Sequence, residues 1–241
     1  MFKAGADQAH SAPVTPTAPS LQPCDAATLI LVDRQGKDFK VLMGRRHSGH
    51  VFMPGKFVFP GGRTDPGDGH VPVAKGLHPY EEAKLSAHVT RTTPARAIAL
   101  SAIRETYEEA GFLVGNKGAF SFTRPDWQGF AEHGVIPSLH NLRFVARAIT
   151  PPGWARRFDT RFFAGFRDSI AVELPQGGPS NELEDLLWLT FDQALQLDLA
   201  MITRTILKDI QMRLACDPDL APGGPVPFYQ SLNNCTIRTL L

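Results

Sequence analysis

The stretch from residue 93 to residue 111 constrains the fold more than any other part of the chain. Thr93 and Pro94 are typical of a helix cap and of a first helical position, and residues 95–110 are good helix formers. Gly111 stands where the glycine that ends a helix is expected. The sequence therefore predicts one long helix with a sharp C-terminal end.

Strand patterns lie on both sides of this helix. Residues 27–32 and 39–44 read as a hairpin, and residues 57–59 as a short strand stopped by Pro60-Gly61-Gly62. Residues 112–137 are expected to be irregular, with a turn of helix near Trp127. The last 25 residues, which are rich in Pro and Gly, are expected to wrap the surface. Further strands are expected at 142–149, 157–166 and 186–190, and further helices at 191–197 and 202–215. Strands and helices do not alternate regularly, which favours an α+β fold (an α/β/α sandwich) with a mixed β-sheet between helices.

Charge and cysteine content exclude several classes of protein. The 25 basic and 24 acidic residues give a net charge of +1, so we expect no nucleic-acid partner and no anionic membrane surface. No apolar run is long enough to span a membrane. The three cysteines lie far apart without a CxxC spacing, as in a reducing compartment, and we expect a cytoplasmic protein. Residues 1–24 lack large apolar side chains and are expected to form a disordered tail.

Three glutamates crowd the end of the predicted long helix. Glu105, Glu108 and Glu109 have the i, i+3, i+4 spacing that brings side chains to one face. They lie in the last turns, where the helix dipole disfavours negative charge, so a cation is expected to offset them. Carboxylates are ligands that Mg²⁺ and Mn²⁺ prefer. Arg104 is placed to orient Glu108 four residues later. The alternative is a solvated, salt-bridged helix surface.

Two motifs resemble the Nudix box. Residues 104–112 (RETYEEAGF) match the second half of that box, R-E-U-x-E-E-x-G-U with U apolar, although Thr106 is a weak U. Residues 59–62 (FPGG) match the turn that opens the box in many members. The resemblance implies a Nudix fold over residues 25–215, with residues 216–241 as an extension of the same domain.

The two halves of the box are unusually far apart. Their separation implies an insertion at about residues 63–93, which is similar to a long-insertion subset of coenzyme A and acyl-coenzyme A diphosphatases. Counting back from Arg104, Arg96 stands where the first glutamate of the box is expected. The role of that glutamate is therefore either vacant or filled from the insertion.

The stretch before the FPGG turn matches the motif of coenzyme A-cleaving members only in part. The matching positions are Leu42, Arg46, Gly55 and the turn itself; the departures are Gly44, His47 and Val51. Arg45 and Arg46 are candidates for gripping phosphates, the alternative being an exposed strand end.

Two later segments contribute further candidates. In RFDTRFF (residues 157–163), Asp159 or Arg161 is a candidate for lining the cleft, against plain core packing. In ELEDLLW (residues 182–188), Glu182 fits better than Glu184 the loop glutamate that completes the metal site or acts as base in many members. A simple exposed loop acid is the alternative.

The resemblance implies a metal-dependent enzyme that cleaves a nucleoside diphosphate linked to another group, with Mg²⁺ or Mn²⁺ as cofactor and coenzyme A or acyl-coenzyme A as favoured substrate. Alternatives are ADP-ribose, NADH or dinucleoside polyphosphates, or a non-catalytic nucleotide-sensing module. The resemblance also leaves room for a homodimer. The resemblance implies that the metal ligands are Glu105, Glu108, Glu109 and the Gly61 carbonyl. It implies that Arg104 is catalytic and that either Glu105 or Glu182 is the base. The implied substrate contacts are Arg45, Arg46, Gly62 and Arg161.

Overall fold

The computed structural model describes residues 22–49, 54–87, 93–233 and 235–241. Most of the predicted tail, and Val51 of the partial coenzyme A motif, lie outside these residues. The described chain begins its first strand at Cys24.

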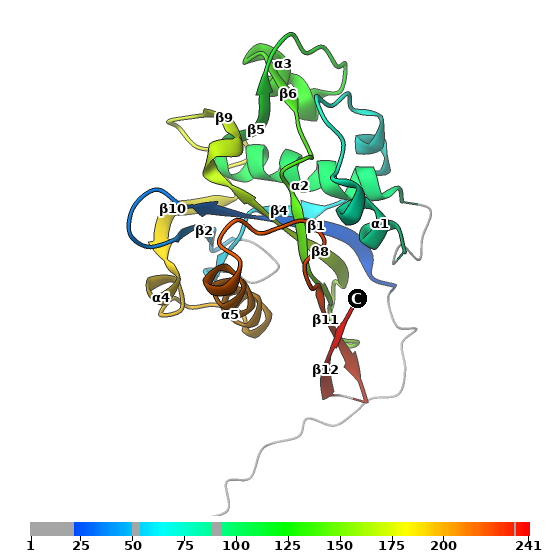
Figure 1. The fold of residues 1–241 in the computed structure, drawn as a ribbon, viewed down its shortest axis with the longest axis vertical. Helices are drawn as coiled ribbons and strands as arrows, with labels where there is room; N and C mark the ends of the chain where they lie inside the picture. The colour runs from blue at the N-terminus through cyan, green and yellow to red at the C-terminus, as the bar shows by residue number, and fades with distance from the viewer. Residues whose placement is uncertain (1–21, 50–53, 88–92, 234) are drawn as a thin grey trace, which may run out of the picture.

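A mixed sheet forms the middle layer of the protein (Figure 1). Its main path runs β10-β2-β1-β8-β7-β11-β12, with β3 paired to β2 and β4 paired to β1. The pairs β1·β8 and β7·β11 are parallel and the other pairs of this sheet are antiparallel. The bounds are β1 Cys24–Asp33, β2 Lys40–Arg46, β3 Phe57–Val58, β4 Gly61–Arg63, β7 Arg143–Ile149, β8 Phe158–Phe166, β10 Leu183–Thr190, β11 Pro227–Leu232 and β12 Cys235–Leu240.

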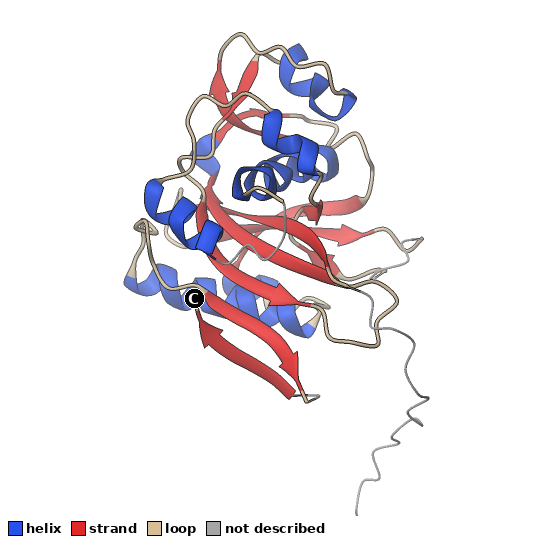
Figure 2. Cartoon of the chain, turned by 90° about the vertical axis from the view of Figure 1, so that its right-hand side faces the viewer, coloured by secondary structure: helices blue, strands red, loops and turns tan. Residues whose placement is uncertain are grey.

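Helices cover both faces of this sheet (Figure 2). Helix α2 (Ala95–Ala110) packs on one face, in a core cluster that includes Leu29 and Leu31 of β1. Helix α5 (Met201–Cys216) packs on the other face, in a cluster that includes Ile30 and Val32. The alternation along β1 buries both of its faces, as the apolar run predicted. The expected α+β fold with a mixed sheet between helices is confirmed.

The long helix differs from its prediction at one end only. Pro94 is the N-cap residue rather than the first helical position, and no side chain caps the helix there. Gly111 ends the helix with φ 75°, a left-handed conformation in which its N–H donates to the carbonyl of Tyr107. Glycine adopts this conformation without the clash that a Cβ atom causes.

Residues 112–137 contain the expected turn of helix at Trp127, but they also contain two strands, so the prediction of an irregular segment was wrong there. The C-terminal segment forms a hairpin that the sequence did not predict. Within residues 112–137, β5 pairs with β6 on one side and with β9 on the other to form a second, smaller sheet. Within residues 216–241, the hairpin β11–β12 extends the main sheet beyond β7 (Figure 2). These strands are short, and β7 and β9, with which β11 and β5 pair, are distant in sequence, so pattern alone does not reveal them. The remaining elements are η1 Pro66–His70, α1 Pro79–Ala87, β5 Phe112–Lys117, η2 Pro125–Trp127, α3 Gln128–Glu132, β6 Val135–Pro137, η3 Arg167–Ser169, β9 Ile170–Glu173 and α4 Phe191–Ala194.

The insertion is attached to the rest of the fold by buried polar contacts. Glu81 of α1 is buried and accepts hydrogen bonds from the backbone N–H groups of Phe144 and Gly223. Lys84, one turn later, donates to the carbonyl of Gly223. The insertion therefore holds the loop between α5 and β11 in place. Among the described helices, none combines the length and apolar character needed to cross a membrane.

Candidate active site

The C-terminal half of α2 lies against the FPGG turn. Strand β4, which contains Gly61 and Gly62, pairs with β1 and contacts α2. A Cβ atom on Gly62 would lie 2.4 Å from Oε2 of Glu105. Only glycine at this position lets the turn approach the carboxylate so closely.

Arg104 is the centre of the acidic cluster. Its Nη1 donates to Oε1 of Glu105 and to Oε2 of Glu108, both at 2.7 Å. Its Nη2 donates to the carbonyl of Arg63 at 3.0 Å, and its Nε lies 3.1 Å from Oδ2 of Asp68. One planar guanidinium thus fixes two carboxylates of the box and the end of β4. The sequence-based assignment of Arg104 as the orienting group agrees with this geometry.

Asp68 is a site residue that the sequence reasoning missed. Its carboxylate is 0% exposed and accepts from Arg104 Nε and, at 3.1 Å, from the indole N–H of Trp127. The first glutamate of an ordinary box lies six positions after its glycine and eight before its arginine. Counting back from Arg104 gives Arg96, whereas counting forward from Gly62 gives Asp68, because the insertion lengthens the chain between them.

Asp68 lies within the predicted insertion at about residues 63–93. It is therefore a candidate to fill that role from the insertion, which is one of the two alternatives expected, with an aspartate in place of a glutamate. Arg96 instead donates to the carbonyls of Gly69 and Val71 and holds the chain that leaves Asp68.

Glu109 is the most buried glutamate of the box. It is 3% exposed, and its Oε2 accepts from the Gly61 N–H at 2.8 Å. Its Oε1 lies 3.7 Å from Nη2 of Arg46. Gly61 therefore meets the cluster through its N–H, while a metal-binding role for its carbonyl stays a prediction.

Burial makes the ionised forms of the box glutamates unfavourable. Burial raises the pKa of Glu109 to about 8, although Arg46 and the Gly61 N–H oppose the rise. Burial also raises the pKa of Glu108 to about 7, against the attraction of Arg104. The pKa of Glu105 is raised for the same reason, with Glu182 and Asp68 adding to the effect. Buried carboxylates of this kind are stabilised by an added cation.

The donor set fits a hard divalent cation. It consists of carboxylate oxygens beside a glycine backbone, and these are ligands that Mg²⁺ and Mn²⁺ prefer. Within the described residues, no group of three acidic, histidine or cysteine side chains is already arranged as a metal site. Glu105 and Glu108 point to Arg104, and Glu109 to Gly61 and Arg46. Cation binding therefore requires these carboxylates to exchange a present partner for the ion.

Of the adjacent arginines Arg45 and Arg46, and of the nearby glutamates Glu182 and Glu184, one of each lies at the acidic cluster and the other does not. Nη1 of Arg46 lies 3.7 Å from Oε2 of Glu182, so Glu182 is beside the Arg46–Glu109 pair. Arg45 instead binds Asp185 and lies 3.3 Å from Glu184 on a solvent-exposed surface. Glu182 and Arg46 are thus brought to the cluster, while Glu184 and Arg45 are not.

Arg161 lies in the interior rather than in a cleft. It is 1% exposed, and its Nη1 donates to Asp25 Oδ1 at 2.6 Å and to the carbonyl of Asp159. Asp159 is in turn bound by Arg147. The expectation that Arg161 or Asp159 lines the cleft is therefore not supported, because both are held in a buried ion-pair network.

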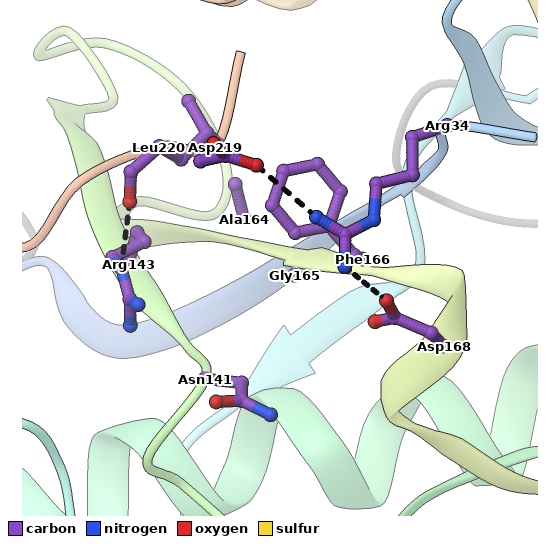
Figure 3. Close-up of a pocket in the computed structure, with 9 residues that line it drawn as sticks. All are labelled: Arg34, Asn141, Arg143, Ala164, Gly165, Phe166, Asp168, Asp219 and Leu220. Carbon is purple, nitrogen blue, oxygen red and sulfur yellow. Dashed lines mark hydrogen bonds and ion pairs between the residues drawn. The ribbon is translucent and has the colours of Figure 1, made fainter. Parts of the chain in front are cut away.

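A cavity of about 300 Å³ adjoins the cluster and is lined by Glu108, Asp126 and Glu132 among other residues. Another, of about 420 Å³, lies away from the box residues (Figure 3). There Arg34 lies over the Phe166 ring and forms ion pairs with Asp168 and Asp219. None of the sequence-predicted site residues lines this second cavity.

No protein-family model matches the chain, and no curated protein matches it. Solved structures do match. A Nudix hydrolase from Alicyclobacillus acidocaldarius is 28% identical, with a TM-score of 0.55, over 78% of this chain and 90% of that one. The Nudix domain of Shewanella oneidensis NrtR, solved with ADP ribose, is 13% identical, with a TM-score of 0.46, over 80% and 90%. RenU, a Nudix hydrolase of M. smegmatis, is 18% identical, with a TM-score of 0.44, over 81% and 88%.

Of these three structures, the Alicyclobacillus hydrolase is the one whose likeness carries an argument beyond the fold. The chain has the fold of the Nudix hydrolases, and this likeness supports the Nudix family and a pyrophosphohydrolase activity.

Proposed function

We propose that the protein is a divalent-metal-dependent pyrophosphohydrolase that cleaves a nucleoside diphosphate linked to another group. The observation that carries this proposal is the Arg104 cluster, in which Asp68, Glu105 and Glu108 meet one guanidinium. A surface salt-bridge network, the alternative reading of these acids, does not account for the complete burial of Asp68 or for the close approach of Gly62.

Glu105, Glu108 and Glu109 would hold Mg²⁺ or Mn²⁺, with the Gly61 carbonyl as a further candidate. Such an ion, when bound, neutralises the charge of a diphosphate and polarises its phosphorus centre. The chain's own residues supply the rest. Arg104 holds two carboxylates in fixed orientations, and Arg46 supplies a positive charge beside Glu109.

A carboxylate is also needed to accept a proton from the attacking water. Glu105 and Glu182 are the two candidates, and both lie close enough to Glu109 to affect its pKa. Glu105 is held by Arg104, whereas the side chain of Glu182 is 43% exposed and accessible to solvent. The pKa of Glu105 is raised by burial, which makes this carboxylate a stronger base than an exposed glutamate.

Coenzyme A or an acyl-coenzyme A is the proposed substrate. The long insertion and the partial motif around Arg46 support it, and the structure places Arg46 rather than Arg45 beside the cluster. ADP-ribose, NADH and dinucleoside polyphosphates are the alternatives. A homodimer in a cytoplasmic setting stays a prediction from the sequence.

Product analysis by chromatography tests the proposal. The purified full chain is incubated with Mg²⁺ or Mn²⁺ and coenzyme A, acetyl-coenzyme A, ADP-ribose, NADH or diadenosine tetraphosphate. Release of 3′,5′-ADP and a phosphopantetheine is the expected result, and a chelator should abolish it. Cleavage of another panel member keeps the metal chemistry and overturns the coenzyme A assignment. No product from any compound with either metal would contradict the enzymatic proposal and favour a sensing module.

A further inference from the structure

Arg46 occupies an unusual position between two acidic groups of the candidate site. It is the last residue of β2 and pairs with Leu183, the residue after Glu182. Its side chain is only 15% exposed. Its Nη2 lies 3.7 Å from Glu109 and its Nη1 lies 3.7 Å from Glu182, so one guanidinium spans two carboxylates that belong to distant segments.

These contacts neutralise charge without fixing the guanidinium. A separation of 3.7 Å is too long for a hydrogen bond, although it is within reach of electrostatic attraction. The Nε of Arg46 is buried and has no hydrogen-bond partner among the described residues. Buried N–H donors are normally paired, so an unpaired one suggests a missing partner.

Arg104 shows the opposite arrangement in the same site. Its nitrogens donate at 2.7 Å to Glu105 and Glu108 and at 3.0 Å to the carbonyl of Arg63. Arg104 is therefore a fixed part of the scaffold, while Arg46 has a buried Nε without a partner and lies beside the most buried glutamate of the box.

We propose that Arg46 is an exchangeable counter-ion: it neutralises Glu109 and Glu182 while no divalent cation is bound, and it turns its donors to the anionic diphosphate of the substrate when a cation takes its place. This inference rests on the proposed function, because it assumes that Glu109 is a metal ligand.

Simple electrostatics favours such an exchange. A cation bound at Glu109 would lie about as far from the Arg46 guanidinium as Glu109 does now. At that distance two unit positive charges repel enough to weaken cation binding roughly sixfold, even at the dielectric constant of water. The effect is larger for a divalent ion in a partly buried site. A diphosphate accepts two parallel N–H bonds from a guanidinium, so the displaced arginine gains a better partner than the carboxylates offered.

The experiment compares Arg46→Met with Arg45→Met, a matched control on the adjacent residue. Arg45 is bound to Asp185 on the surface and does not reach the cluster. Mg²⁺ is titrated into the metal-free full chain by calorimetry at pH 9. We expect R46M to bind Mg²⁺ roughly fivefold tighter than the wild type or more, and R45M to bind it unchanged.

The second half of the experiment measures the anion. Methylenediphosphonate, a diphosphate that is not hydrolysed, is titrated into each variant saturated with Mg²⁺. We expect R46M to bind it roughly tenfold more weakly or worse, and R45M to bind it as the wild type does. Arg46→Lys keeps the charge but loses the two-pronged donor, so it should keep the Mg²⁺ affinity of the wild type and bind the diphosphonate more weakly.

Two outcomes would overturn the exchange: Mg²⁺ binding by R46M that equals or falls below that of the wild type, or unchanged diphosphonate binding by R46M and R46K. Either can occur while the wild type still binds Mg²⁺ and cleaves its substrate, so the proposed function would survive. Failure of the wild type itself to bind Mg²⁺ or Mn²⁺ would contradict both proposals.

Discussion

Asp68 and Arg104 form a buried ion pair across 36 positions of sequence. Asp68 lies in the short helix η1 after the FPGG turn, and Arg104 lies in the middle of α2, so the pair connects the two halves of the box despite the chain inserted between them. The indole of Trp127 completes the hydrogen bonding of the carboxylate. This pair explains how a divided motif forms one site, because Arg104 can orient Glu105 and Glu108 only when it is itself held.

Replacing Asp68 with Asn should therefore damage both stability and activity. Asn keeps an acceptor for Trp127 but leaves Arg104 without one of its countercharges. Breaking a buried pair from one side typically lowers the free energy of unfolding by ~3 kcal/mol or more, and loss of an orienting partner typically costs ~10- to 100-fold in activity or metal affinity. Urea unfolding and steady-state kinetics measure the two effects. Asp65→Asn is the control, since that side chain is half exposed and pairs with Arg124 at the surface; it should change stability by ~1 kcal/mol or less.

Replacing Glu108 or Glu109 with Gln should remove a metal ligand without altering side-chain volume. We expect turnover to fall by roughly 100-fold or more while the fold is retained. Glu109→Gln should also leave the metal-free protein at least as stable as the wild type at pH 9, because burial of the ionised Glu109 is unfavourable. Initial rates and circular dichroism check these outcomes, and near-normal turnover in both variants would refute the metal-site assignment.

The stability of the metal-free protein should depend on pH in a definite direction. The folded pKa values of Glu108 and Glu109, about 7 and about 8, lie above the ordinary value of 4.5. Groups with raised folded pKa values contribute stability that is fully present below pH 4.5 and is lost as the pH rises through 7 and 8. Asp33 and Asp65 have lowered pKa values, so their contribution is lost only as the pH falls below the ordinary carboxyl range.

Added Mg²⁺ should reverse this loss, since it competes with protons for the same carboxylates. The increase in melting temperature caused by Mg²⁺ is therefore expected to be small at pH 6 and larger at pH 9. Thermal unfolding with and without Mg²⁺ at these two values gives the comparison, with Glu109→Gln as a control that should show a weaker pH dependence. A Mg²⁺ effect that is equal at both pH values would contradict the proposed ligands.

Replacing Gly62 with Ala should displace Glu105. The new methyl group would lie 2.4 Å from Oε2 of that carboxylate, so either the turn or the glutamate must move. Misplacement by about 1 Å can lower rates on the order of 100-fold, and we expect a loss of roughly 10- to 100-fold here. Gly76→Ala is the control, because a Cβ atom at Gly76 meets nothing within 4 Å. Steady-state kinetics of the two variants are compared. Equal activity would show that the close approach of Gly62 to Glu105 is not needed for catalysis.

Much of the fold was predictable because its signals are local. Helix α2 follows from helix propensity and from Gly111, and β1 from an apolar run that is buried on both faces. Helix α5 follows from the spacing of its apolar residues. Strand β5 and the hairpin β11–β12 were not predictable in this way, because they are stabilised by partners far away in the sequence.

The sequence by itself determined which chemistry is present: three glutamates at helical spacing, an arginine beside them and a glycine turn. Only the tertiary structure decided which other groups join them. It brings Asp68 to Arg104, and it brings Arg46 rather than Arg45 to Glu109. Glu182, which the sequence already favoured over Glu184, lies beside Arg46. Arg161, a candidate for lining the cleft, lies instead in a buried ion-pair network with Asp25 and Asp159. The physical reason is that helical spacing is a short-range property of the backbone, whereas a countercharge is selected by distance and burial, which depend on how separate segments pack.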